Sequence, residues 1–171
     1  MTISRRTLIR QVLLASAGAV LIPSCMEDRS KASLLLKHVS ITGTQEKLLA
    51  ELAESIIPKT TTPGAKDISA HLFALQMMDD CRSAEAQQAF MEGLRAFEKG
   101  QGKDFIGLSA AERARRLEAL EAGKDEQTPE QQFYREMKKL TIQAYTGSEY
   151  FLTKVQVYEL VPGRYHGCVP A

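Results

Sequence analysis

The sequence contains no tryptophan, and its three histidines, His38, His71 and His166, lie far apart. No two of them stand four residues apart, and the CxxC and HExxH patterns typical of zinc sites are absent. The glycine-rich patterns that bind nucleotide phosphates, the Gly-x-Ser-x-Gly elbow of hydrolases and the CxxCH attachment site for haem are absent as well. We therefore expect the chain to have neither a metal site nor a cofactor of its own.

The sequence also lacks a surplus of charge of either sign, with 22 Lys and Arg against 21 Asp and Glu. Because no basic tract stands out, binding to nucleic acid is not expected. Enzymatic chemistry without a cofactor would need two acid–base groups in one cleft, and the candidates are Asp67, Asp79, His71 and His166. The simpler interpretation of Asp79 and Asp80, near the end of a predicted helix, is that both are solvated surface carboxylates.

Residues 1–24 have the layout of a secretory signal, with a basic head, an apolar run and small residues before Cys25. Arg5 and Arg6, followed by hydrophobic residues, match a twin-arginine export address. The apolar run over residues 12–22 is too short to cross the roughly 30 Å hydrocarbon core of a membrane. Cys25 resembles the lipobox cysteine of bacterial lipoproteins, which is acylated. We therefore predict that residues 1–24 are removed and that the chain is exported to the periplasmic side of the cell envelope, anchored to a membrane by a lipid on Cys25.

Residues 25–43 are interpreted as a tether, because their first part is charged and offers little to bury. Within it, residues 34–36 and 39–41 are apolar enough to pack as a short arm. The remainder, residues 44–171, is predicted to be one helical domain, since Lys, Glu, Ala, Leu and Gln are abundant.

Apolar spacing and capping signals predict about five helices in this domain. The first three are residues 45–57 capped by Thr44, residues 68–81 capped by Asp67, and residues 84–99 capped by Ser83. The fourth begins at residue 110, after a capping box of Ser109 and Glu112, and turns Leu117 and Leu120 inward. The fifth covers residues 129–145 and is started by Thr128, Pro129 and Gln131.

In the second helix, the residues expected to face inward include Phe73, Leu75, Gln76 and Met78. A further short turn or helix is expected over residues 150–155. The predicted fold class is all-α: a single compact domain with Pro/Gly-rich loops and an irregular C-terminal strap.

Two cysteines lie in the domain, Cys81 and Cys168. In an oxidising compartment they are candidates for a disulfide, which would stabilise the fold by about 4–5 kcal/mol through chain entropy. The alternative is two separate buried thiols that act as small apolar side chains.

Two loops rich in Pro and Gly are candidates for binding another protein, residues 56–65 and residues 158–170. The second loop contains Tyr158 and Tyr165, and tyrosine provides a large contact area at a low cost in conformational entropy. The alternative for the second loop is a strap that packs over the helices. The candidate partner-binding residues are Pro58, Pro63, Gly64, Pro162, Gly163 and Tyr165.

These two loops also carry a resemblance to a known family. The residues are Ile56-Ile57-Pro58, Thr62-Pro63-Gly64-Ala65 with Asp67, and the C-terminal Tyr158…Pro162-Gly163-x-Tyr165-x-Gly167-Cys168-x-Pro170. On a helix–loop–helix behind a twin-arginine signal, this pattern resembles subunit 3 of gluconate 2-dehydrogenase. The resemblance covers most of residues 44–170, and between residues 83 and 127 it rests only on the helical pattern.

The resemblance implies a small, non-catalytic subunit of a membrane-associated dehydrogenase. A large flavoprotein subunit carrying FAD would oxidise the substrate, and a cytochrome subunit carrying haem c would pass the electrons on. The small subunit would bind the flavoprotein, and the twin-arginine export machinery would carry both across the membrane. The alternative function is a free-standing, lipid-anchored helical binding module of the cell envelope, with a pocket of its own and no oxidoreductase partner.

Overall fold

The computed structural model describes residues 32–100, 104–123 and 128–156, and this part of the chain folds into one compact domain without strands. The predicted all-α fold class and number of helices are confirmed. The elements are α2 (Gly43–Ile56), α3 (Ala70–Cys81), α4 (Ala84–Lys99), the 3₁₀ turn η2 (Phe105–Gly107), α5 (Ala110–Ala122), α6 (Pro129–Thr146) and the π-helical turn η3 (Phe151–Val155).

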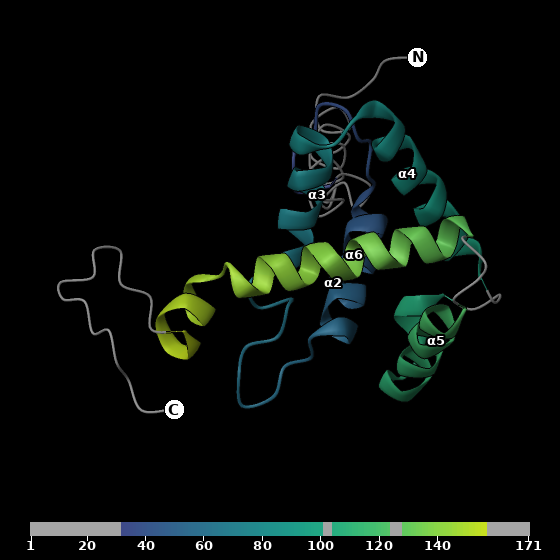
Figure 1. Ribbon diagram of the computed structural model, residues 1–171. Helices are drawn as coiled ribbons and strands as arrows, with labels where there is room; N and C mark the ends of the chain where they lie inside the picture. The colour runs from purple at the N-terminus through teal and green to yellow at the C-terminus, as the bar shows by residue number, and fades with distance from the viewer. Residues whose placement is uncertain (1–31, 101–103, 124–127, 157–171) are drawn as a thin grey trace, which may run out of the picture.

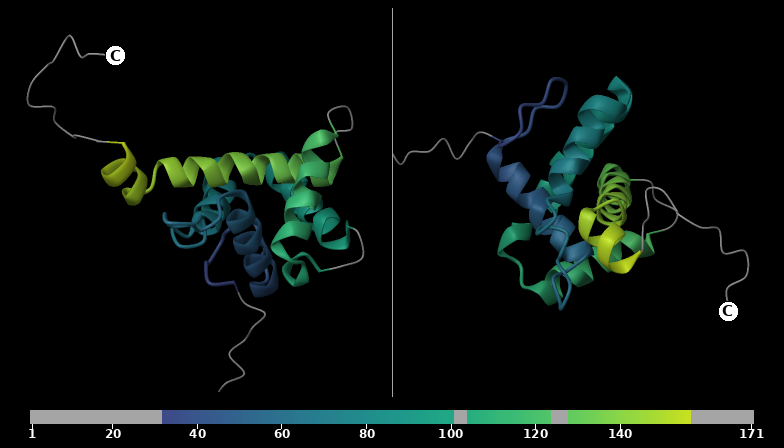
Figure 2. Two further views of the ribbon diagram at one scale, coloured as in Figure 1. Left: turned by 90° about the horizontal axis from the view of Figure 1, so that it is seen from below. Right: turned by 90° about the vertical axis from the view of Figure 1, so that its left-hand side faces the viewer.

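Helix α6 organises the domain, because α4, α3, α2 and α5 all pack against it. It runs across the whole molecule in Figure 1, and Figure 2 shows the other helices gathered along one side of it. Its start is the predicted one. The Thr128 hydroxyl accepts from the backbone N–H of Gln131, the Gln131 side chain accepts from the backbone N–H of Thr128, and Pro129 stands in the first turn. None of the described helices is long and apolar enough to span a membrane.

Four phenylalanines form the centre of the core. Phe90 and Phe97 of α4 lie 5.0 Å and 5.5 Å from the ring of Phe133 on α6, measured between ring centroids, and Phe105 of η2 lies 5.1 Å from Phe97. These tilted contacts are the favourable geometry for aromatic pairs. The buried faces of α4 and α6 therefore meet at these rings.

The start of α2 differs from the prediction by two residues. The helix begins at Gly43, and its N-cap is Thr42 instead of Thr44. Thr42 forms a capping box with Gln45, which stands three residues further on. Thr44 has no such partner at this spacing, so Thr42 is the residue that can satisfy the free amides of the first turn.

The start of α3 is also corrected. Asp67 does not cap it; the helix begins at Ala70 after Ser69, whose φ of 56° places it in the left-handed region. The Asp67 carboxylate instead accepts from the backbone N–H of Gly64 (3.1 Å). Gln76, expected to face inward, is exposed, and Ala74 and Leu75 take the buried positions.

Helix α5 presents two arginines to the core side. Arg113 holds η2 in place, because its guanidinium donates to the backbone oxygens of Phe105 (3.1 Å) and Ile106 (2.6 Å). It also pairs with Glu51 of α2 at 2.7 Å. Arg116 is almost fully buried beside Phe97, and its carbon Cζ lies 4.3 Å from the centre of that ring. Two charged side chains of α5 thus lie beside Leu117, which was predicted to face inward.

Candidate docking surfaces

The acid–base candidates do not converge within the described residues. Asp67 belongs to the loop before α3, and Asp79 is buried at the end of α3. His71 is buried in α3; burial lowers its pKa, and its Nδ1 has no hydrogen-bond partner among the described residues. His166 lies outside the described residues. Among the residues that the structure describes, no group of His, Cys, Asp or Glu could hold a metal ion.

The first Pro/Gly loop, between α2 and α3, is built around the carboxylate of Glu54. This carboxylate accepts from the backbone N–H groups of Lys59 (2.8 Å) and Lys66 (2.9 Å), at the two ends of the loop. The backbone N–H of Ala65 donates to the oxygen of Ile57 at 2.9 Å and closes the loop. An added Cβ at Gly64 would clash with the Glu54 carboxylate and lie 2.7 Å from the backbone nitrogen of Lys59. Because the backbone cannot move aside cheaply, glycine is required for this close approach.

The predicted partner-binding residues of this loop lie in different environments. Pro58 is exposed, Pro63 is half-buried and Gly64 is buried. The backbone oxygen of Pro63 accepts from the hydroxyl of Tyr145 on α6 at 2.9 Å, which ties the loop to the central helix. Pro63 and Gly64 therefore have a structural role, and of the three only Pro58 presents a free surface. Pro162, Gly163 and Tyr165 lie outside the described residues, as do Arg5, Arg6 and Cys25.

The expected arm is bound to the domain through Asp79. The two oxygens of its carboxylate accept from the backbone N–H groups of Lys37 (2.7 Å), His38 (2.6 Å) and Val39 (2.8 Å). Val39 is buried beneath this contact. The interpretation of Asp79 as a solvated carboxylate was therefore wrong, while Asp80 beside it is exposed. Burial opposes ionisation of Asp79, but the three amides outweigh it, so the pKa of the carboxyl is lowered.

We expect Asp79→Asn to lower the free energy of unfolding by about 1–2 kcal/mol at neutral pH, because an amide cannot accept three bonds in this geometry. A lowered folded-state pKa means that the contribution is present above the unfolded-state value of about 3.9 and is lost as the pH falls through the folded-state pKa. Urea unfolding of both proteins, followed by circular dichroism, should therefore show curves that separate at pH 7 and converge below about pH 4.

The matched control is Asp80→Asn, because within the described part of the chain Asp80 makes only a 3.9 Å ion pair with the exposed Lys37. Its effect should stay within about 0.5 kcal/mol. Equal losses for the two variants would contradict the role assigned to Asp79.

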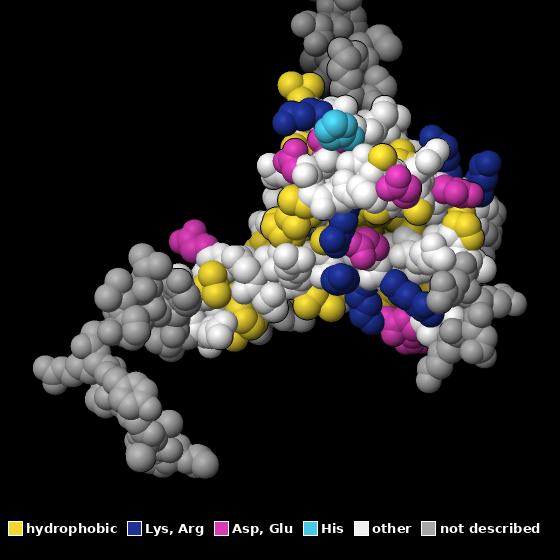
Figure 3. Space-filling view, turned by 45° about the horizontal axis from the view of Figure 1, so that its top comes forward, with side chains coloured by type: hydrophobic (Ala, Val, Ile, Leu, Met, Phe, Trp, Pro, Cys, Tyr) yellow, Lys and Arg dark blue, Asp and Glu magenta, His cyan; other side chains and the backbone are white. Residues whose placement is uncertain are grey.

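A cleft of about 360 Å³ lies between α3, α4 and α6. Its floor is apolar and is formed by Met78, Phe90 and Phe133. Two small side chains of α4, Ala86 and Ala89, leave its mouth open. Figure 3 shows hydrophobic side chains in the furrow beside α6 with charged side chains at its edge. This size is at the lower end for ligand pockets and fits one or two large side chains of another protein.

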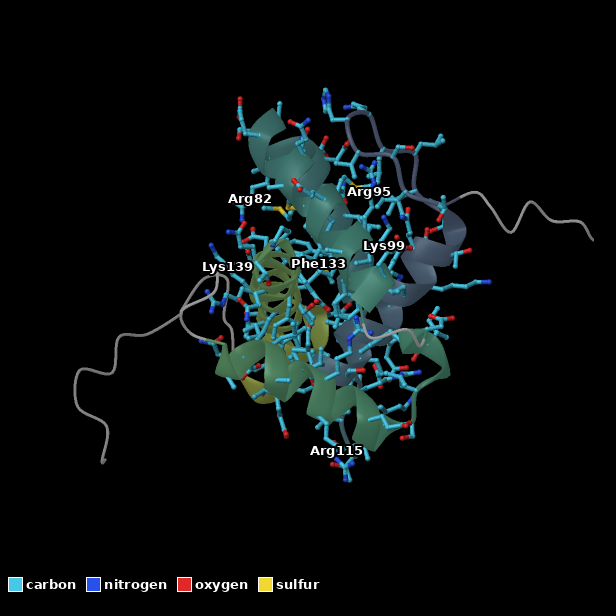
Figure 4. The ribbon with its side chains drawn as sticks, turned by 90° about the vertical axis from the view of Figure 1, so that its right-hand side faces the viewer. Arg82, Arg95, Lys99, Arg115, Phe133 and Lys139 are labelled. Atoms are coloured by element: carbon cyan, nitrogen blue, oxygen red, sulfur yellow. The ribbon has the colours of Figure 1, made fainter. Side chains whose placement is uncertain are left out.

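The rim of this cleft is charged. Arg82, which follows α3, pairs with Glu136 of α6 at 2.5 Å, and each of these side chains is 30% exposed. Lys139, one helical turn beyond Glu136, is exposed and makes no ion pair with another described residue. Figure 4 shows Arg82 and Lys139 on the same side of Phe133. An apolar floor with a polar, partly unpaired rim is the usual composition of a protein-binding hot spot.

A second, more open groove of about 620 Å³ runs between the residues before α3 and the end of α6. Ile68, Phe73 and Ala144 line its apolar part, and Tyr150 and Lys154 come from η3. Cys81 is exposed at the end of α3, and Cys168 lies outside the described residues, so their pairing stays a prediction.

Sequence reasoning missed the cleft because its lining comes from three helices. Met78 is expected to face inward, but Ala86 and Ala89 carry no signal of their own. A pattern could have indicated the rim: Gln132, Glu136 and Lys139 repeat at spacings of four and three on α6 and mark a solvent-facing stripe.

Comparison with known families identifies the chain. The model of the family described as gluconate 2-dehydrogenase subunit 3 matches residues 43–163, which include all the described helices and the first Pro/Gly loop. Searches of curated proteins and of solved structures gave no match. With well over half of its length matched, the chain belongs to the gluconate 2-dehydrogenase subunit 3 family.

Proposed function

We propose that this chain is the small, non-catalytic subunit of a membrane-associated, flavin-dependent dehydrogenase. It binds the large flavoprotein subunit, which carries FAD, and assists its export and anchoring. Family membership supports this proposal most directly, since the family is named as a subunit of a dehydrogenase. A cytochrome with haem c completes the proposed complex as the electron acceptor.

The cleft between α3, α4 and α6 is the proposed docking site for the flavoprotein. Three observations favour it over the first Pro/Gly loop. Its floor is apolar, its rim carries the exposed Lys139, and its mouth is open above Ala89. In the loop, by contrast, Pro63 and Gly64 are used for internal contacts with Tyr145 and Glu54.

We expect Ala89→Arg to weaken flavoprotein binding at least about tenfold, because the long side chain would cover the apolar floor. Ala89 is exposed on α4, and arginine is a good helix former, so folding should be little changed. The measurement is affinity capture of the tagged chain from its native envelope, with FAD absorbance in the captured fraction as the readout.

The matched control is Ala119→Arg, at an exposed position of α5 away from the cleft. It should capture as much flavin as the unchanged chain. If neither the unchanged chain nor the control captures a flavoprotein, the proposed function fails; if all three capture it equally, only the choice of docking site fails. The same assay also tests shared export. In a chain with Arg5→Lys and Arg6→Lys, the captured flavin should remain in the cytoplasmic fraction, because the export address is lost.

The open groove beside η3 favours a second candidate, the lipid-anchored binding module. Its volume of about 620 Å³ lies within the range of small-molecule sites. Under this alternative the chain purifies from the envelope alone and carries a ligand in the groove. Mass spectrometry of the captured protein under native conditions separates the two functions, since one predicts a bound flavoprotein and the other a bound small molecule.

A further inference from the structure

The arm between the predicted tether and α2 exposes an unusually large apolar side chain. Leu35 is 98% exposed, compared with 56% for Val155 and 43% for Ile142, the other exposed large hydrophobic residues of the described chain. Single exposed hydrophobic residues are common on protein surfaces. Leu35 differs because its two neighbours, Leu34 and Leu36, are half-buried, so the chain turns this one side chain outward.

The position of Leu35 is held from both sides. On its N-terminal side, the backbone N–H and the hydroxyl of Ser33 both donate to the carboxylate of Glu46, at 2.6 Å and 2.7 Å. On its C-terminal side, the Asp79 carboxylate binds the backbone N–H groups that begin at Lys37. Leu36 also packs against the main core. A side chain presented on such a fixed loop loses little conformational entropy when it binds.

Lys37 and His38 follow Leu35 closely in the sequence. The side chain of Lys37 is 77% exposed, and its only described ion pair is the 3.9 Å contact with Asp80. His38 is exposed as well. Figure 3 shows hydrophobic, basic and histidine side chains together at the upper end of the molecule, and in Figure 2 the arm projects beside α2. Surfaces that insert into a membrane often combine an apolar side chain, which enters the lipid, with a neighbouring cation, which stays at the level of the phosphate groups.

We propose that this tip, Leu35 with Lys37, is a second point of contact with the membrane. Leu35 enters the boundary between headgroups and acyl chains, and Lys37 pairs with lipid phosphate. The inference rests on the anchoring part of the proposed function. Leu35 follows the predicted acylation site, Cys25, by ten residues, which span at most roughly 36 Å when extended. A lipid on Cys25 would therefore hold the tip within reach of the same surface.

The absence of tryptophan makes a direct test available, because Leu35→Trp gives the chain a single tryptophan at the tip. The protein consists of residues 26–171, which include every described residue, with a hexahistidine tag in place of Cys25. The tag binds vesicles that contain nickel-chelating lipid, so the tether is reproduced without acylation and without a flavoprotein. We expect a blue shift of the tryptophan emission on vesicles, and quenching by lipids brominated in the acyl chains.

The matched control is Ile142→Trp, an exposed apolar position on α6. Its emission should stay unchanged on the same vesicles. In a second measurement without nickel lipid, Leu35→Ser should reduce partitioning onto phosphatidylglycerol vesicles about tenfold, the effect of burying one leucine. Replacing phosphatidylglycerol with phosphatidylcholine should weaken binding further through Lys37.

An unshifted emission for Leu35→Trp on tethering vesicles would overturn the proposal. A shift that appears only when the flavoprotein is added would also overturn it and would assign the tip to the protein partner. Loss of flavin capture in the cleft experiment leaves this result unaffected, because the vesicle assay contains no partner protein.

Discussion

Replacing Arg116 with alanine should lower the free energy of unfolding by about 3–5 kcal/mol, the range for breaking a buried charged contact from one side. Arg116 is 4% exposed, and its Nη2 donates to the backbone oxygen of Phe97 at 2.5 Å and to the carboxylate of Glu130 at 3.0 Å. Its cation also faces the ring of Phe97. Alanine would leave a backbone acceptor and a half-buried carboxylate without their donor and would open a cavity beside the aromatic cluster.

The measurement is urea unfolding followed by circular dichroism, and the control is the adjacent Arg115→Ala. Arg115 points away from the core in Figure 4 and has no ion pair among the described residues. Its replacement should change the free energy of unfolding by less than about 0.5 kcal/mol. A small effect at Arg116 would indicate that the cost of desolvating the buried guanidinium is as large as the stabilisation from its hydrogen bonds and ion pair.

Local signals in the sequence were sufficient to predict most of the helical framework. The ends of α4, α5 and α6 follow from capping side chains and apolar spacing, which act within four residues of one another. The errors occurred where two similar signals compete. Thr42 and Thr44 are both good caps, and only the spacing to Gln45 decides between them.

The contacts that could not be predicted join residues distant in sequence. Asp79 binds amides about forty positions upstream, and a backbone amide has no residue type to identify it. Arg116 was detectable in principle. Arg113, Arg116 and Leu117 lie at spacings of three and four, so both arginines fall on the apolar stripe of α5. Charged residues on such a stripe indicate either solvent exposure or a buried pair, and only the fold distinguishes these cases.

The first Pro/Gly loop shows how a motif can be located correctly and still be given an incomplete role. Its prolines and glycine suggested a binding surface, because rigid loops bind at low entropic cost. In the fold, Gly64 is needed where the loop approaches Glu54, and the backbone oxygen of Pro63 accepts a hydrogen bond from the hydroxyl of Tyr145. Sequence composition does not distinguish a loop that is rigid in order to bind from one that is rigid in order to close the domain.

Gly93→Val should lower the free energy of unfolding by about 3 kcal/mol, because the larger side chain would force apart α4 and α6, which form the centre of the core. A Cβ at Gly93 of α4 would lie 2.5 Å from the Cβ of Phe133 and 2.5 Å from the backbone oxygen of Pro129, both on α6. Neither atom is the end of a flexible side chain, so α4 would have to move away from α6.

Two opposing effects of substitution at Gly93 can be separated experimentally. Alanine in a helix is favoured over glycine by about 1 kcal/mol, whereas overpacking costs about 1–3 kcal/mol. Because the contacts at Gly93 are with backbone and Cβ atoms, we expect overpacking to dominate. Gly93→Ala should therefore lower the free energy of unfolding, and Gly93→Val should lower it more. The control is Gly107→Ala, where an added Cβ meets nothing within 4 Å. A rise in the urea midpoint for Gly93→Ala would show that the helix crossing can relax. The cleft above Phe133 would then be adjustable in width, and Gly93→Ala should also change flavoprotein binding.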